Sequence, residues 1–426
     1  MRRMLAELGP DVVGAGQARR RRYALRRALR GRLAPLNVYA LNEADGAIQP
    51  LGELALRQPQ GCHFHAPSAT WPSTPGEHAD GWWEGLPYML QDMRPQGYMG
   101  RQFARQHHTA LELDPDPNRW SDDDTLVALS RAGTDLPGNL IVGDVALAQW
   151  QALRTQGLSL VPARQLGERY VQLAEQAIAS GFAGSSAAGE FPKFTAPREL
   201  AGARTPHVIV KFSGADRSPA VQRWADLLVC EHLALQALGA LTGISVASSR
   251  IVQHAGRTFL ESERFDRHGH WGRSAVVSLS TLDACFIGTR HPDWPELARR
   301  LSELGWLHAQ QVQQVSLIWW FGRLIGNTDM HTGNLSFVPH QGRLQLAPAY
   351  DMLPMMYAPL PGGELAQRTL DPPWAPPGQQ DAWRPAGEAA LSFWQAAAHD
   401  GRISEAFRAH CAVNASRLMA LLSSAI

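Results

Sequence analysis

Two kinds of apolar patterning alternate along this chain. Apolar residues recur at helical spacing in three segments, residues 160–180, 230–238 and 312–324. Short runs rich in aliphatic and β-branched residues predict strands at residues 38–41, 207–211, 249–253 and 257–262. The pattern predicts an α+β protein whose strands come mostly before residue 265 and whose last part is mostly helical.

Turn-forming residues divide the chain into parts. Residues 67–80 read as a loop, and the Pro- and Gly-rich residues 359–385 predict a long one. A length of 426 residues favours two or three domains. The expected parts are residues 1–33, a basic segment; residues 34–150, a β-rich domain; residues 151–265, a small lobe; and residues 266–426, a helical lobe.

Charge is unevenly distributed. The net charge of +1 gives no general affinity for nucleic acid or membranes, but residues 1–32 hold ten Arg against Glu7 and Asp11, which is +8 and leaves about −7 for the rest. The cluster suits contacts with DNA phosphates, which position a protein without reading sequence. A solvated basic tail is the alternative. The residues of the cluster are Arg19, Arg20, Arg21 and Arg22.

Cysteine and hydropathy patterns bear on the compartment. The four cysteines are widely spaced and form no CxxC motif, which is typical of reduced thiols. The basic N-terminus lacks the apolar core of a secretory signal. The longest apolar run, residues 317–321, is far too short to span a bilayer. We expect a soluble, cytoplasmic protein with no membrane partner.

The strongest chemical signal is a spacing of acidic and amide residues. Asp329 precedes Asn334 by five residues, and Asp351 follows a short strand-like run. A protein-kinase catalytic loop has the same interval between its catalytic Asp and Asn, followed by a second Asp. One Asp must accept the proton of a hydroxyl, whereas the Asn and the second Asp supply the hard oxygen ligands that Mg²⁺ prefers. The spacing predicts Asp329 as a base and Asn334 and Asp351 as magnesium ligands.

Lysine usage supports this interpretation. The chain has 40 basic Lys and Arg residues, yet only Lys193 and Lys211 are lysines. Lys211 ends the strand-like run 207–211, as the ATP-contacting lysine of kinases does. Glu231 lies twenty residues later in a helical pattern, so it is the expected partner of Lys211.

The motifs together resemble the HipA-like kinases, which are serine/threonine kinase toxins of bacterial toxin–antitoxin systems, and most closely their YjjJ-type branch. The resemblance covers roughly residues 100 to 355, and five motifs follow the family's order. They are residues 186–193 (SAAGEFPK), 208–211 (VIVK), 261–267 (ESERFDR), 326–334 (GNTDMHTGN) and 349–351 (AYD). Each motif is weak alone, but five in register are specific.

The resemblance implies a bilobal, protein-kinase-like fold with a β-rich N-terminal domain and a mostly α-helical C-lobe. It implies Mg²⁺-dependent transfer of the ATP γ-phosphoryl group to a protein serine or threonine, growth arrest as the role, and an antitoxin as a partner. Family substrates include aminoacyl-tRNA synthetases. The first 33 residues resemble the end of a winged helix-turn-helix, with two short strands around an Arg-rich turn.

Further site residues follow from the resemblance alone. Glu263 and Phe265 take the places where the hinge backbone binds adenine, and Asp266 takes the place near the ribose. His331 matches a histidine near the nucleotide phosphates. Ser186 matches the serine that is autophosphorylated, with Ser185 as a rival.

Two departures from the family pattern matter. Residues 190–192 are Glu-Phe-Pro where the family has Ala-Gln-Glu, and Gly333 stands where the family often has a lysine before the catalytic-loop Asn. The second departure removes a positive charge that could stabilise the transferring phosphoryl group. Two alternatives therefore stay open: a small-molecule kinase, and a DNA-binding regulator whose kinase fold binds nucleotide without transferring phosphate.

Overall fold

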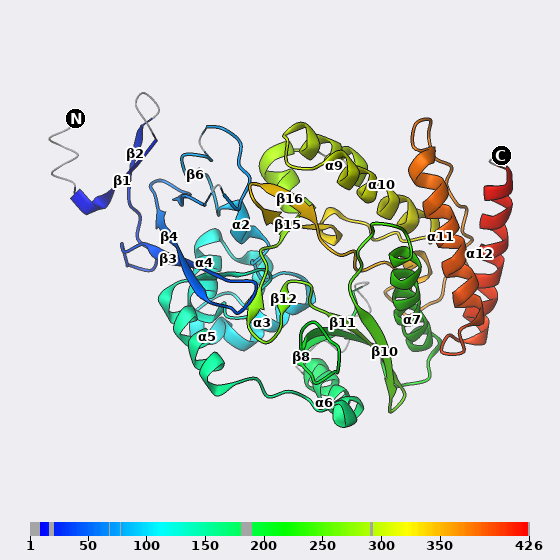
Figure 1. The fold of residues 1–426 in the computed structure, drawn as a ribbon. Helices are drawn as coiled ribbons and strands as arrows, with labels where there is room; N and C mark the ends of the chain where they lie inside the picture. Colours follow the sequence, from blue (N-terminus) through cyan, green and yellow to red (C-terminus); the bar gives the residue numbers. More distant parts are fainter. Residues whose placement is uncertain are drawn as a thin grey trace.

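The first elements form a small antiparallel hairpin. The structure, a computed structural model, describes residues 9–16, 21–67, 69–76, 78–179, 190–289 and 293–424. Strand β1 (Val12–Ala15) pairs with β2 (Arg22–Leu25), with Val12 opposite Leu25. The hairpin projects from one end of the molecule (Figure 1), so the two short strands expected in the basic segment are confirmed.

A five-stranded sheet with four helices builds the next part, which we call the N-terminal unit (residues 36–156). Its strand order is β6-β5-β4-β3-β7. The strands are β3 (Leu36–Leu41), β4 (Ile48–Leu56), β5 (Cys62–His63), β6 (Trp82–Trp83) and β7 (Leu140–Val142). The helices are α2 (Tyr88–Gln91), α3 (Gly97–Leu111), α4 (Asp122–Ala132) and α5 (Asp144–Gln156). Helix α4 begins at a capping box in which Ser121 and Asp124 satisfy each other's backbone N–H groups.

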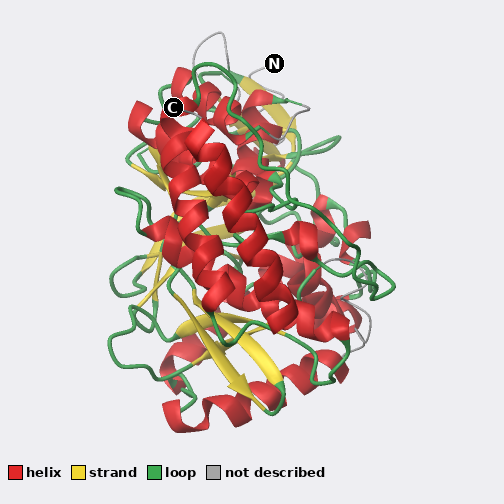
Figure 2. Ribbon diagram, turned by 90° about the vertical axis from the view of Figure 1, so that its right-hand side faces the viewer, coloured by secondary structure: helices red, strands yellow, loops and turns green. Residues whose placement is uncertain are grey.

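A second, four-stranded sheet contains the predicted Lys211 strand. Its order is β10-β11-β9-β8, with β8 (Lys193–Pro197), β9 (His207–Phe212), β10 (Ser249–His254) and β11 (Arg257–Glu263). Helices α6 (Leu166–Ala179) and α7 (Pro219–Gly239) belong to this part, and Figure 2 shows its broad strands below the helical bundle. The expected strands and the Glu231 helix are confirmed. The pattern at 160–180 begins as a helix only at Leu166, because Pro162 and a short 3-10 turn precede it.

Helices dominate the last part. They are α8 (Leu279–Leu282), α9 (Trp294–Glu303), α10 (Ala309–Leu324), α11 (Gln380–His399) and α12 (Glu405–Ser424). A hinge hairpin, β12 (Arg267–His268) with β13 (Gly272–Arg273), and a three-stranded sheet, β14 (Val277–Ser278), β15 (Ser336–His340) and β16 (Arg343–Leu346), complete it.

One loop boundary predicted from composition is wrong. The loop expected to reach residue 385 ends before Gln380, and Pro385 lies inside α11. The apolar face of α11, with Trp383, Phe393 and Trp394 buried, packs against α10, α12 and α7, and this burial outweighs the missing proline hydrogen bond.

One large apolar core joins the parts. It runs without a break from the N-terminal unit (Val38, Leu54) through α7 to the helices at the C-terminal end (Phe393, Leu418). A smaller core lies between α6 and the second sheet. No helix among the described residues is long and apolar enough to cross a membrane.

Candidate active site

The chain turns sharply between α10 and the predicted catalytic loop. Gly326 has a φ of +71°, and a Cβ there would lie 2.5 Å from the Sδ of Met356. Asn327 then binds both halves of the site, because its Oδ1 accepts the Asp329 backbone N–H at 3.0 Å and its Nδ2 donates to the Asp351 carbonyl at 3.3 Å. Sequence reasoning assigned no role to Asn327, although Asn side chains often hydrogen-bond the backbone two residues on, as Asn327 does here.

The structure brings Asp329 and Asn334 together. Asn334 Nδ2 donates to the Asp329 backbone carbonyl at 2.8 Å, so the five-residue interval closes into one compact loop. His331 Nδ1 accepts the Gly333 N–H at 3.1 Å and thereby caps the short turn at residues 332–334. Burial raises the pKa of Asp329 above its ordinary value, while the nearby His331 acts in the opposite direction. Asp329 is therefore better suited to hold a proton than an ordinary surface Asp.

The expected lysine–glutamate pair is present. Lys211 Nζ on β9 lies 2.8 Å from both carboxylate oxygens of Glu231 on α7, and it also contacts the Asp351 carboxylate. Glu231 is only 2% exposed, so an unpaired charge there would be costly. Burial alone would lower the pKa of Lys211, but Asp351 and Glu231 raise it above its ordinary value. The ammonium therefore stays charged at neutral pH.

Asp351 adopts a backbone conformation that few non-glycine residues adopt. Its φ is +58°, in the left-handed region. Its neighbour Tyr350 holds it there, since the Tyr350 hydroxyl donates to the Gly333 carbonyl at 2.9 Å and its ring stacks on Phe265 at 5.6 Å. Tyr350 thus connects the predicted catalytic loop at Gly333 with the hinge at Phe265.

The catalytic-loop residues line one large cavity. A cleft of about 1370 Å³ is bordered by Asp329, His331, Asn334 and Asp351, and on its other side by residues of the N-terminal unit such as Asp92. Asp92 accepts the backbone N–H of Ser278 at 2.6 Å, so it fixes the start of α8 from outside the helical part. The cleft is therefore walled by three parts of the chain.

The donor set of the cleft fits a magnesium ion. The Asn334 side-chain N–H donates to the Asp329 carbonyl, so the side-chain oxygen of Asn334 remains available as a metal ligand. Asp351 uses one carboxylate oxygen toward Lys211 and has a second. Burial alone would raise the pKa of Asp351, but Lys211 holds it below its ordinary value, so the group is ionised. Two hard oxygen donors beside a cationic side chain suit Mg²⁺ bound together with phosphate oxygens.

Two residues that sequence reasoning left without a role lie at the cleft. Lys193 on β8 stands directly opposite Lys211 on β9, so both lysines of the chain share one face of the sheet. Glu190 lies 3.6 Å from Lys193 and accepts the Tyr98 N–H at 2.7 Å and an Arg101 N–H at 2.8 Å. Glu190 thereby caps α3 of the N-terminal unit. The scarcity of lysine was the available signal for Lys193.

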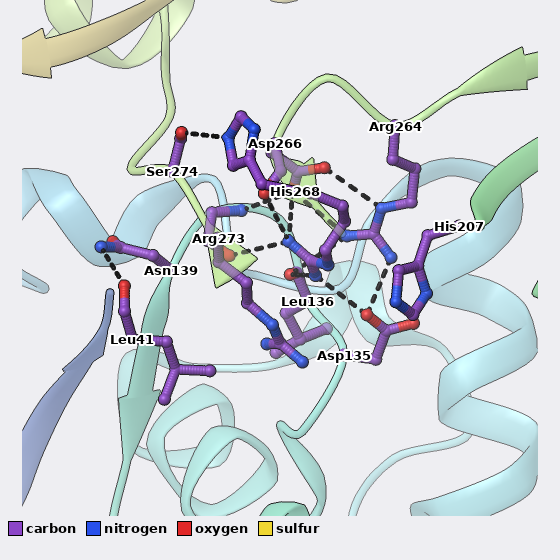
Figure 3. A network of polar contacts seen from close by, with 12 residues as sticks. Leu41, Asp135, Leu136, Asn139, His207, Arg264, Asp266, His268, Arg273 and Ser274 are labelled. Carbon is purple, nitrogen blue, oxygen red and sulfur yellow. Dashed lines mark hydrogen bonds and ion pairs between the residues drawn. The ribbon is translucent and has the colours of Figure 1, made fainter. Parts of the chain in front are cut away.

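The polar side chains of the hinge motif are held by arginines and by the N-terminal unit. Glu263 accepts a hydrogen bond from Arg198 at 2.9 Å, and its backbone N–H donates to Ser248. The Asp266 carboxylate is held by Arg264, by Arg267 at 2.7 Å and by the Gly138 N–H at 2.9 Å (Figure 3). Asp266 does not border the large cleft described above. Its contacts connect the hinge to the N-terminal unit, and its place near a ribose stays a prediction.

Figure 3 shows that the hinge network is crowded with arginine. Arg264 and Arg267 each form ion pairs with Asp266 and Asp135, whereas Arg273 lies beside them and donates to the Thr134 carbonyl at 2.8 Å. The surrounding guanidinium groups lower the pKa of the Asp266 carboxyl to about 2, although burial alone would raise it. The network thus ties the hinge to the N-terminal unit through ionised groups.

Some predicted residues cannot be placed. Ser185, Ser186, Arg19 and Arg20 lie outside the described residues. Of the remaining cluster, Arg22 belongs to β2, and Arg21 lies 5.5 Å from the centre of the Tyr23 ring.

Comparison with known proteins decides the family. Residues 185–409 match the HipA-like C-terminal domain, and residues 33–151 match the middle domain of YjjJ-like toxins. The chain is 38% identical over 397 residues to the toxin YjjJ of Escherichia coli strain K12, which covers 93% of this chain and 86% of that protein. The chain belongs to the YjjJ-like branch of the HipA-like toxin family.

A solved structure supports the fold of this HipA-like toxin. The Shewanella oneidensis HipA, determined with HipB and its operator DNA, superposes with a TM-score of 0.54 at 17% identity, covering 91% of this chain and 97% of that one. The predicted fold class, α+β with a β-rich N-terminal part and a helical C-terminal part on a HipA-like, kinase-type plan, is confirmed. The resemblance inferred from the five motifs is confirmed as well.

Proposed function

We propose that this HipA-like toxin is a Mg²⁺- and ATP-dependent serine/threonine protein kinase. The observation that carries the proposal is the convergence of Asp329, Asn334 and Asp351 on one cleft, with Lys211 held against Asp351 by a buried glutamate. Phosphoryl transfer depends on positioning and charge stabilisation more than on covalent chemistry, and this arrangement supplies both.

Each group has a distinct role in the proposed reaction. Lys211 holds the ATP phosphates, and Glu231 fixes the direction of its ammonium group. Asn334 and Asp351 hold the magnesium ion, which neutralises charge on the phosphates when bound. Asp329 orients the acceptor hydroxyl and accepts its proton. His331 supports the loop through its cap at Gly333 and lies at the edge of the cleft.

Lys193 provides a second cation at the cleft, which lacks one at position 333. It lies opposite Lys211 and lines the same cleft, and its charge reaches Asp351. We propose that Lys193, which the motif of residues 186–193 shares with the family, contacts phosphate oxygens together with Lys211. The site then retains two ammonium groups for the phosphates.

The proposal includes Ser186 as the residue that the protein phosphorylates on itself. The test is an incubation with γ-labelled ATP and Mg²⁺, followed by mapping of the label, for the wild type, Asp329→Asn and Ser186→Ala. Label on Ser186 that is lost in both variants supports an active kinase. Absence of label on the protein and on added protein substrates, with ATP still bound in calorimetry, would refute kinase activity and favour a nucleotide-binding regulator.

Partners belong to the same proposal. The solved Shewanella HipA structure contains HipB and operator DNA. We propose that an antitoxin binds this chain too, and that Arg19 to Arg22 contact DNA phosphates. Replacement of the four arginines with alanine should weaken DNA binding and reduce its salt dependence, measured by fluorescence anisotropy at several salt concentrations. Unchanged binding would refute the DNA contact.

A further inference from the structure

A second cavity lies on the far side of the catalytic loop. Its volume is about 720 Å³, and it shares Thr328, Asp329 and His331 with the large cleft. Neither Asn334 nor Asp351 borders it. Asp329 therefore stands between two cavities, one with the proposed magnesium ligands and one without them.

The two cavities suit the two reactants of a phosphoryl transfer. The attacking and leaving oxygens lie roughly in line, so the acceptor must approach from the side opposite the nucleotide. If ATP fills the cleft with Asn334 and Asp351, the hydroxyl reaches Asp329 from the second cavity. We propose that this second cavity, which we call the acceptor groove, binds a polypeptide segment with an apolar residue and an acidic residue near the serine or threonine. The inference rests on the proposed function and adds the substrate class.

The apolar part of the groove is preformed. It is lined by Trp319 of α10, Met356, Leu370 and Pro373. Hydrogen bonds hold the wall residues in place: the Met356 N–H donates to the Gly326 carbonyl at 3.0 Å, Arg417 to the Leu370 carbonyl at 3.0 Å, and the Trp383 indole to the Pro373 carbonyl at 2.9 Å. A groove with fixed walls binds an apolar side chain with little ordering cost.

A single arginine supplies the positive charge of the groove. Arg323 is exposed, and its guanidinium lies 5.7 Å from the ring centres of both Trp319 and Trp320. It forms no ion pair with any residue in the part of the chain that the structure describes. Because the indole rings fix the planar group without neutralising it, Arg323 can bind a carboxylate of a partner. This charge complementarity favours an acidic residue in the substrate.

The lining combines apolar and charged groups. Asp329 and Asp371 are its carboxylates and Arg323 is its guanidinium, so the acidic residue of the substrate must bind at Arg323 itself. A mainly apolar groove with a cation at one point fits an extended chain of several residues.

The test uses a positional-scanning library of serine-centred peptides with the full-length protein. The library is first selected for binding in the presence of Mg²⁺ and a non-hydrolysable ATP analogue, and is then phosphorylated with γ-labelled ATP. Variants are Arg323→Gln, Arg323→Glu and the matched control Arg164→Glu, which makes the same charge change at an exposed residue that borders neither cavity.

We expect the wild type and Arg164→Glu to enrich Asp or Glu at one position near the serine by about fivefold, as one surface charge contact allows. Arg323→Gln should lose this preference, and Arg323→Glu should replace it with Lys or Arg. Identical selection by the wild type and Arg323→Glu, or no selection by the wild type, would overturn the acceptor groove. Charge-dependent binding without transfer of label would support the groove while refuting the kinase activity, so the two failures are distinguishable.

Discussion

Replacement of Asp266 with asparagine should destabilise the fold by removing charge from the hinge network. The ordinary pKa of Asp is 3.8, and the surrounding arginines lower the pKa of Asp266 to about 2. One pKa unit corresponds to 1.36 kcal/mol, so the ionised carboxylate stabilises the folded state by about 2–3 kcal/mol more than a neutral group would. Asparagine keeps the shape but not the charge, and the side chain is only 10% exposed, so solvent screens little of the effect.

The sign of the pH dependence follows from the lowered pKa. The stabilisation is complete above about pH 5, and it falls as the pH drops from about 4 to about 2, with about half lost by pH 3. The assay is urea unfolding followed by circular dichroism at pH 7 and pH 3, with Asp45→Asn as the control. Asp45 is exposed and accepts only the Ala47 N–H through Oδ1, an atom that asparagine retains. A loss below about 0.5 kcal/mol for Asp266→Asn, or an equal loss at both pH values, would refute the electrostatic account.

Three further predictions concern the cleft. Asp329→Asn should slow phosphoryl transfer by about 10²- to 10⁴-fold while ATP binding in calorimetry stays unchanged. The acid limb of the wild-type pH–rate profile should lie above pH 3.8, because burial raises the pKa of Asp329. Equal rates for the wild type and the variant would show that Asp329 is not the base. Lys211→Met should lower the free energy of unfolding by about 3–5 kcal/mol, because it leaves Glu231 buried and unpaired. Adding Glu231→Gln should restore stability in thermal unfolding but should not restore ATP affinity in calorimetry. Failure of the double variant to recover stability would contradict the pairing argument. Asn334→Ala should weaken ATP binding in the presence of Mg²⁺ but not in EDTA, and equal weakening in both would exclude Asn334 as a ligand.

Local spacing predicted the centre of the site well. The interval from Asp329 to Asn334 requires a single short turn, and the Lys211 strand and the Glu231 helix have clear patterns of their own. The hydrogen bonds and ion pairs among these residues are therefore encoded in short segments or in elements that follow one another. Their roles in catalysis and metal binding remain predictions.

Contacts between distant segments could not be predicted in the same way. Glu190 caps α3 across 92 positions, and Asp92 caps α8 across 186. Asp266 was assigned by its place in a motif, yet its environment is set by Asp135 and Gly138, which lie about 130 positions earlier and carry no pattern that marks them as partners. Propensity and periodicity describe single elements, whereas these contacts depend on how the parts pack. The loop expected at residues 359–385 failed for the same reason. Composition places Pro385 in a loop, whereas burial of the apolar face of α11 against other helices keeps it in a helix.

The pairing of Lys193 with Lys211 has a consequence for chemical modification. These are the only lysines in the chain, and they face each other across neighbouring strands at the proposed nucleotide site. Amine-directed acylation, whether enzymatic acetylation or an acyl-phosphate probe, has no other side chain to react with besides these two. If the cleft binds ATP as proposed, any lysine modification found on this protein would report on access to that cleft, and bound nucleotide would protect both lysines at once.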